Sequence, residues 1–206
     1  MYLHNRLNKQ NNFFQKIRDL DLVLLGSILL LGFISLATMY STDGGQILFH
    51  TKSHFIKFSV FISLMLVISF MNIKIWFSIS YAVYFLIVLM LIWTINFGVT
   101  ASGSQRWIDL YFINIQPSEL MKISIILCLA KYFHRMKLES VNSFYAVIIS
   151  LIIIIVPMSL VVIQPDLGTS LLISISGITV LWFAGLNHKY FFYTFLITII
   201  SLPFII

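Results

Sequence analysis

The sequence predicts an all-α integral membrane protein, a polytopic bundle with about seven spans. Sixty per cent of its 206 residues are hydrophobic and only 10% are charged, whereas soluble domains are about half apolar and a quarter charged. The mean hydropathy is +0.99. At about 20 residues per span, such a length accommodates roughly six to eight helices and leaves no room for a sizeable soluble domain.

The apolar runs are separated by short polar segments, with boundaries good to about three residues. The polar segment 1–21 is predicted to be a cytoplasmic tail, because the first run is too long for a signal peptide and no cleavage site follows. Residues 22–206 form a transmembrane helical domain. The last run reaches Ile206 without a polar anchor, so we expect an N-terminal portion of a longer protein. The predicted spans are 22–40, 54–71, 75–97, 117–133, 143–163, 167–186 and 190–206.

The net charge of +6 comes from an excess of Lys and Arg, and these residues are unevenly divided between the two sides of the predicted membrane domain. With a cytoplasmic N-terminus, the inner segments carry nine of these residues and the outer segments carry only Lys52 and Arg106. Cytoplasmic loops are enriched in Lys and Arg, so this asymmetry predicts the orientation and makes nucleic-acid binding improbable. The single cysteine, Cys128, is interpreted as a packing residue within an apolar run. The nine inner residues are Arg6, Lys9, Lys16, Arg18, Lys74, Lys131, Arg135, Lys137 and Lys189.

The fourth span begins with Gln116-Pro117-Ser118-Glu119, followed by Lys122. Proline suits the first helical position, and a carboxylate in the first turn meets unpaired amides and the positive end of the helix dipole. Lys122 lies three residues after Glu119, within reach of its carboxylate. Taken alone, this motif also fits a helix start with an ion pair.

The sixth span begins with a similar motif, Gln164-Pro165-Asp166, and continues to Thr169. We expect Pro165 at the first helical position and Asp166 in the first turn. The predicted topology places both Gln-Pro starts at the outer face, where helix N-termini bind anions. Our hypothesis is a polar cavity near the outer leaflet in which Lys122 bridges Glu119 and Asp166.

The outer segment 98–116 is expected to contain a turn at Gly103 and its flanking serines and to fold onto the membrane surface or the bundle. Arg106 can bind a phosphate or carboxylate with two parallel hydrogen bonds. Trp107 favours the level of the lipid headgroups. His50 and His54 have the spacing of a metal pair but no evident third ligand, so no metal site is predicted.

Three motifs in this order and spacing resemble the SEDS family (shape, elongation, division and sporulation). They are Gly103 to Ile108, Gln116 to Lys122, and Gln164 to Ser170, with Gly185-Leu186 as a fourth similarity. Gln105 before Arg106 is more similar to the elongation branch, which maintains cell shape, than to the division branch. The resemblance covers the chain from about residue 20.

The resemblance implies the first part of a ten-helix glycosyltransferase of the bacterial plasma membrane that polymerises lipid II into glycan strands on the outer face. It implies a class B penicillin-binding protein, a transpeptidase, as partner. No cofactor is evident, although a divalent cation could assist the leaving pyrophosphate. By the resemblance, the catalytic aspartate is expected beyond Ile206. The expected substrate-binding or polar-core residues are Gln105, Arg106, Trp107, Gln116, Ser118, Glu119, Lys122, Gln164, Asp166 and Thr169.

Two other functions stay open on the sequence. A flippase or transporter of lipid-linked precursors would also place helix ends and ions in a membrane cavity, but the inner halves of the spans carry few ionisable residues. A non-catalytic scaffold for the transpeptidase would tolerate substitution of Arg106 and Glu119.

Overall fold

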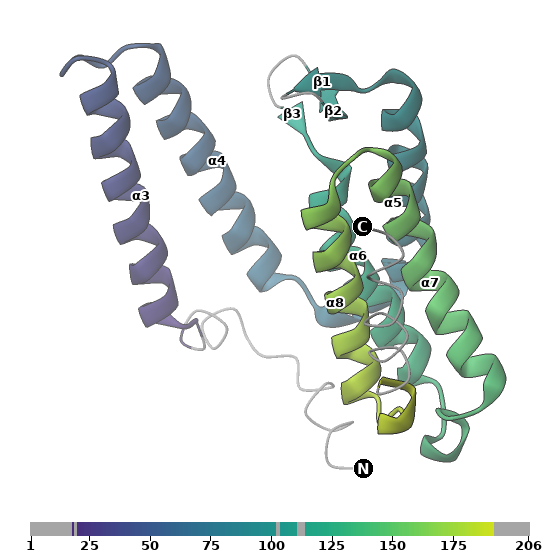
Figure 1. The fold of residues 1–206 in the computed structure, drawn as a ribbon. Helices are drawn as coiled ribbons and strands as arrows, with labels where there is room; N and C mark the ends of the chain where they lie inside the picture. The colour runs from purple at the N-terminus through teal and green to yellow at the C-terminus, as the bar shows by residue number, and fades with distance from the viewer. Residues whose placement is uncertain (1–17, 19, 102–103, 111–113, 192–206) are drawn as a thin grey trace. The chain divides into compact units, whose positions relative to one another are not determined.

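The computed structural model describes residues 18, 20–101, 104–110 and 114–191 (Figure 1). The predicted all-α membrane fold is confirmed, with one small sheet as an addition. Four described helices, α3, α4, α5 and α7, are long and apolar enough to span a membrane. The predicted tail 1–21 lies mostly outside the described residues, and so does the predicted seventh span after residue 191. The elements are α3 (Leu22–Thr42), α4 (Phe49–Phe70), α5 (Ile73–Phe97), β1 (Val99–Ala101), β2 (Ser104–Asp109), β3 (Asn114–Ile115), α6 (Pro117–His134), η1 (Leu138–Ser140), α7 (Phe144–Ile163) and α8 (Leu167–Phe183).

Two compact units divide the chain, Met1–Asn72 and Ile73–Ile206. The first contains the α3–α4 pair. Its connection turns at Gly44 and Gly45, whose φ angles of 72° and 78° favour glycine. Asp43 closes the connection, because one of its carboxylate oxygens accepts hydrogen bonds from the Thr51 N–H (2.8 Å) and hydroxyl (2.7 Å).

Helix α4 begins five residues before the predicted residue 54, at Phe49. The residues between them are mostly polar, and hydropathy marks the part of a helix within hydrocarbon rather than the extent of its backbone hydrogen bonding. The other five predicted spans that lie within the described residues agree with the helices to within three residues at each end.

The second unit packs α5, α7 and α8 around α6, and its core is formed by apolar side chains from all four helices. Gly177 of α8 permits a close approach to α7, because a Cβ atom there would lie 2.6 Å from Ile154 Cγ1. Buried core residues include Leu91, Met121, Ile125, Leu129, Ile154 and Ile173.

Helix α7 contains a proline whose missing N–H is compensated by a neighbouring helix. Pro157 cannot donate to the carbonyl of Ile153, four residues earlier. The Tyr84 hydroxyl of α5 donates to that carbonyl instead, at 2.9 Å. The α5–α7 contact therefore satisfies a backbone group that hydrocarbon would leave unpaired.

A three-stranded antiparallel sheet in the order β1-β2-β3 follows α5. Val99 pairs with Trp107, and Ile108 pairs with Ile115. Strand β2 contacts α5 and α6, so the segment folds onto the bundle, one of the two placements expected from its apolar residues. The sequence did not predict its strands, and the turn predicted at Gly103 lies outside the described residues.

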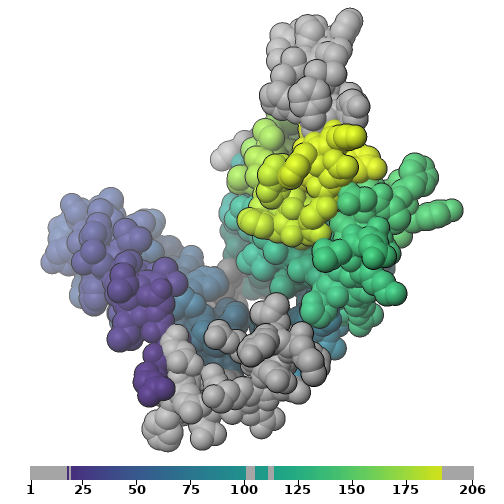
Figure 2. Space-filling model, turned by 90° about the horizontal axis from the view of Figure 1, so that it is seen from below, coloured from purple at the N-terminus to yellow at the C-terminus, as the bar shows by residue number. Residues whose placement is uncertain are grey.

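The opposite end of the second unit is formed by two connections that lie side by side (Figure 2). The side chain of Asn142, before α7, accepts a hydrogen bond from the Asn187 N–H at 2.7 Å. Lys131, one of the nine basic residues assigned to the inner side, is only 5% exposed. Its ammonium group donates to the Ser78 carbonyl (2.7 Å) and lies 4.4 Å from the centre of the Tyr81 ring.

Candidate functional site at the start of α6 and α8

Helices α6 and α8 both begin at the end of the second unit where the sheet lies (Figure 1). Pro117 occupies the first turn of α6, as predicted, and Glu119 lies in that turn. The prediction for α8 was wrong by two positions, because Pro165 was expected at the first helical position. The helix begins at Leu167 with Asp166 as its N-cap, so Pro165 precedes the helix.

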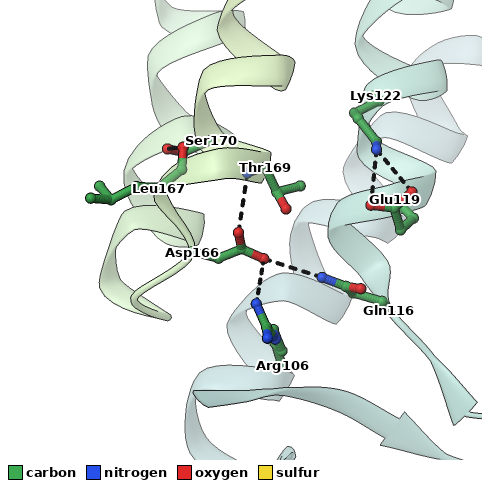
Figure 3. Close-up of polar contacts among 8 residues, drawn as sticks. All are labelled: Arg106, Gln116, Glu119, Lys122, Asp166, Leu167, Thr169 and Ser170. Atoms are coloured by element: carbon green, nitrogen blue, oxygen red, sulfur yellow. Dashed lines mark hydrogen bonds and ion pairs between the residues drawn. The ribbon is translucent and has the colours of Figure 1, made fainter. Parts of the chain in front are cut away.

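Asp166 stands at the centre of a hydrogen-bonded cluster (Figure 3). Its Oδ1 accepts from the Thr169 N–H at 3.1 Å, which is the N-cap bond of α8. Its Oδ2 accepts from Arg106 Nη1 of β2 at 3.0 Å and from Gln116 Nε2 at 3.2 Å. One carboxylate therefore joins the sheet to the starts of both helices.

The charge of Asp166 is stabilised in place although its side chain is only 10% exposed. Burial alone would raise the pKa of this carboxyl group. Hydrogen bonds from Thr169 and the Arg106 guanidinium outweigh that effect and hold the pKa below its ordinary value. Asp166 is thus an ionised group with both oxygens occupied, suited to positioning its neighbours and poorly suited to accepting a proton from substrate.

The predicted bridge from Lys122 to Asp166 is wrong. Lys122 pairs with Glu119, as expected, at 2.8 Å, whereas the cation on Asp166 is Arg106. In Figure 3 the Lys122–Glu119 pair stands apart from the cluster around Asp166. The guanidinium of Arg106 is carried by β2, which packs on α5 and α6, and helix periodicity could not reveal that placement.

The Glu119 side chain is 54% exposed and that of Lys122 is 25% exposed. Ion pairs at membrane depth normally face the interior of a bundle or a water-filled cavity. The face of α6 that carries this pair is therefore a surface from which a polar cavity can be built.

Two buried polar atoms at the site lack a partner among the described residues, Arg106 Nε and Ser118 Oγ. Ser118 is 1% exposed and follows Pro117 in the first turn of α6. An unmet donor usually has an explanation such as a ligand or water. These atoms leave hydrogen-bonding capacity for a polar group beside the cluster.

Two glutamines predicted for the site form structural hydrogen bonds. Gln105 Nε2 donates to the Gly98 carbonyl at 2.7 Å and ties β2 back to the end of α5. Gln164 is 3% exposed, and its amide donates to the Leu91 carbonyl (3.0 Å) and to Thr94 Oγ1 (2.9 Å).

Trp107 is partly buried in β2, and Thr169 is buried beside its N-cap partner. Among the described residues, no cluster of three or more His, Cys, Asp or Glu side chains could hold a metal ion. Sequence reasoning missed Tyr84 as a positioning residue for α7, although Pro157 is a signal, because it frees a carbonyl that a neighbour must satisfy.

The chain matches the family described as "Cell cycle protein" (FtsW, RodA and SpoVE) over residues 17–206. It is 31% identical over 162 residues to the probable peptidoglycan glycosyltransferase FtsW of Buchnera aphidicola subsp. Schizaphis graminum, covering 76% of this chain and 46% of that protein. It is 36% identical over 110 residues to the peptidoglycan glycosyltransferase MrdB of Escherichia coli K12, covering 52% and 28%. The chain therefore spans about half the length, or less, of these curated relatives.

Solved structures share the fold. The Thermus thermophilus rod shape determining protein RodA superposes with a TM-score of 0.74 at 19% identity, covering 91% of this chain and 60% of that one. A chain from a peptidoglycan synthase complex that coordinates polymerization and crosslinking gives 0.75 at 20% identity, covering 88% and 52%.

Proposed function

The chain belongs to the cell cycle protein family of FtsW, RodA and SpoVE, the SEDS proteins that its motifs resemble, and from that membership we propose that the protein is a peptidoglycan glycosyltransferase. It polymerises lipid II into glycan strands at the outer face of the bacterial plasma membrane. The N-terminus is cytoplasmic, so the sheet and the starts of α6 and α8 face outward. By the resemblance, the catalytic aspartate follows Ile206.

The cluster around Asp166 carries this proposal. Lipid II bears a pyrophosphate just outside the hydrocarbon, and this group leaves when the acceptor sugar hydroxyl attacks the donor anomeric carbon. In the proposed reaction, Arg106 and the N-terminus of α6 beside it supply positive potential for that group. Stabilising the developing charge of a leaving group is a large contribution to catalysis.

The side chains at the site have separate roles in the proposed reaction. Arg106 binds the pyrophosphate, using the guanidinium N–H groups that Asp166 does not occupy. Asp166 and Gln116 fix the guanidinium in position. The Glu119–Lys122 pair adds a further polar surface on α6.

The partner and the cellular role are proposed from the same relationships. A solved neighbour belongs to a complex that coordinates polymerization with crosslinking, which supports a class B penicillin-binding protein as the partner. We assign the protein to the elongation branch, with RodA, on the basis of Gln105 before Arg106.

The test uses the full-length protein, purified with its transpeptidase, and fluorescent lipid II. Arg106→Gln is expected to lower the rate of polymerisation by about 10²- to 10³-fold, the usual effect of removing one group that stabilises developing charge. Asp166→Asn is expected to lower the rate less than Arg106→Gln, because Arg106 persists but loses the charged partner that positions it. Arg135→Gln, at the opposite end of α6, is the matched control and retains full activity.

A folded Arg106→Gln protein that polymerises within two-fold of the unmodified rate would overturn the assignment. Translocation of lipid II in vesicles by the unmodified complex, with no polymer formed, would favour the flippase. Tolerance of substitution at both Arg106 and Glu119 would favour the scaffold. Activity with and without a chelator tests the separate proposal that a divalent cation assists the leaving group.

A further inference from the structure

The α3–α4 unit contains a cavity of about 500 Å³ at the connected end of its two helices. This volume lies within the range of small-molecule sites, roughly 300–1,000 Å³. The lining is apolar except at the rim, and comprises Leu36, Ala37, Tyr40, Ile47, Thr51, Lys52 and Phe55. None of these residues belongs to the cluster around Asp166.

With the proposed topology, the cavity lies at the depth of the upper part of a lipid acyl chain. Leu36 is six residues before the end of α3 at Thr42, which is about 9 Å along the helix axis. Ile47 comes from the connection itself, just before α4. A chain inserted here therefore runs from the connection, at headgroup level, into the hydrocarbon.

The rim carries one available positive charge. Lys52 is exposed and forms no salt bridge with the described residues. The nearby Asp43 does not neutralise it, because the two hydrogen bonds from Thr51 hold its carboxylate and the residue is 9% exposed. Hydrogen bonding from the Thr51 side chain and N–H also keeps the pKa of Asp43 below its ordinary value, so this compensated charge persists at neutral pH.

We propose that this cavity binds an anionic phospholipid, with one acyl chain between Leu36, Ala37 and Phe55 and the headgroup phosphate on the Lys52 ammonium. An apolar slot beside a free cation complements a lipid that has a hydrocarbon chain and a net negative charge. A zwitterionic lipid offers the same chain but carries its own cation. A basic residue near the membrane surface favours anionic lipid by about five-fold.

The test uses the full-length protein in nanodiscs that contain a trace of phospholipid with a photoactivatable group on its acyl chain. Labelling of the peptides that cover residues 36–55 is measured by mass spectrometry. Phosphatidylglycerol is expected to label this segment about five-fold more than phosphatidylcholine with the same chains. Lys52→Gln is expected to reduce phosphatidylglycerol labelling to the level of phosphatidylcholine.

Lys57→Gln is the matched control, because Lys57 is an exposed lysine of α4 that does not line the cavity. It leaves the preference unchanged. Ala37→Phe fills the cavity from α3 and is expected to lower the labelling by both lipids, and the Lys52 and Lys57 pair still decides the question if that variant fails to fold.

Equal labelling by the two phospholipids in the unmodified protein would overturn the proposal, and so would equal effects of the Lys52 and Lys57 variants. Displacement of phosphatidylglycerol by an equimolar polyprenyl phosphate would also overturn it, because the cavity would then belong to a polyprenyl-linked molecule. Activity of the Arg106 variants has no bearing on these outcomes.

Discussion

The hydrogen bond from Tyr84 to the Ile153 carbonyl makes a specific prediction about stability. Pro157 leaves that carbonyl without its helical donor, and the tyrosine hydroxyl at 2.9 Å replaces it. Tyr84→Phe removes one oxygen atom and preserves the ring. The carbonyl would then be unpaired between two apolar helices, where water is scarce.

The size of the expected loss of stability follows from the free-energy cost of a backbone acceptor without a donor. Leaving a buried acceptor unpaired costs about 1–3 kcal/mol, while hydrogen bonds measured between membrane helices average about 0.6 kcal/mol. We therefore expect Tyr84→Phe to destabilise the protein by about 1–2 kcal/mol. In a domain of this size, each kcal/mol lowers the unfolding temperature by about 2–4 °C, which thermal unfolding of the purified protein in detergent resolves.

A double-mutant cycle with Pro157→Ala isolates the cause. Alanine restores an N–H four residues after Ile153, so the carbonyl regains a helical donor and the tyrosine becomes dispensable. Tyr84→Phe is expected to cost less than about 0.5 kcal/mol in that background, a coupling well above the error of additivity. Tyr81→Phe is the control on the same helix. Equal costs of Tyr84→Phe with and without Pro157 would refute the explanation.

Three further predictions concern the fold. Gly177→Val places its Cβ 2.6 Å from an atom of Ile154 and should destabilise the protein by about 1–3 kcal/mol through overpacking, seen as a lower unfolding temperature; unchanged stability would contradict the close approach of α7 and α8. Asp43 has a lowered pKa, through hydrogen bonds from Thr51, so its stabilising contribution is complete above its ordinary pKa of 3.8 and disappears as the pH falls through the lower folded value. Asp43→Asn should remove that part of the acid sensitivity, measured as the difference in unfolding temperature between about pH 6 and pH 3, and an undiminished difference would argue against it. Lys131→Met should change the free energy of unfolding by less than about 1 kcal/mol, because a buried ammonium is exchanged for an apolar chain of similar length. Lys131→Glu places a carboxylate against aromatic faces and a carbonyl oxygen and should cost about 3–5 kcal/mol. Similar unfolding temperatures for the two variants would contradict this prediction.

The helices could be predicted because their physical cause is local. A run of apolar residues long enough to span a membrane must form a helix to satisfy its own backbone. The caps are equally local, and Pro117 and Glu119 lie in the first turn of α6 where the sequence placed them. The two-residue error at the start of α8 has a local cause too, because a proline can stand before an N-cap as well as after it.

The contacts of the site could not be predicted, because they join residues that are distant in the sequence. Arg106 and Asp166 are 60 residues apart, and their pairing depends on a sheet that the sequence did not indicate. Lys122 was predicted to bridge Glu119 and Asp166; its pair with Glu119 is present, whereas Asp166 pairs with Arg106 instead. Lys131 contacts Ser78 and Tyr81 of α5, about 50 residues earlier in the chain, and its position in the sequence did not indicate that burial.

The position of Asp166 depends on hydrogen bonds between α7 and α5 in which Asp166 itself takes no part. Each irregularity of the backbone beside α5 is matched by a side chain: Tyr84 satisfies α7 at its proline, and Gln164 binds the last turns of α5 at the point where α7 ends. The two hydrogen bonds of Gln164 fix the end of α7, and Asp166 follows Gln164 by two residues. The placement of the carboxylate, and through it of Arg106, is therefore set by the packing of α7 on α5.

Gln164→Leu keeps the volume of the side chain and removes both of its hydrogen bonds to α5. It should therefore lower the rate of polymerisation by the full-length protein, as Asp166→Asn does, with an unfolding temperature lower by only a few degrees. Full activity of a folded Gln164→Leu protein would show that the α7–α8 turn is held by other contacts.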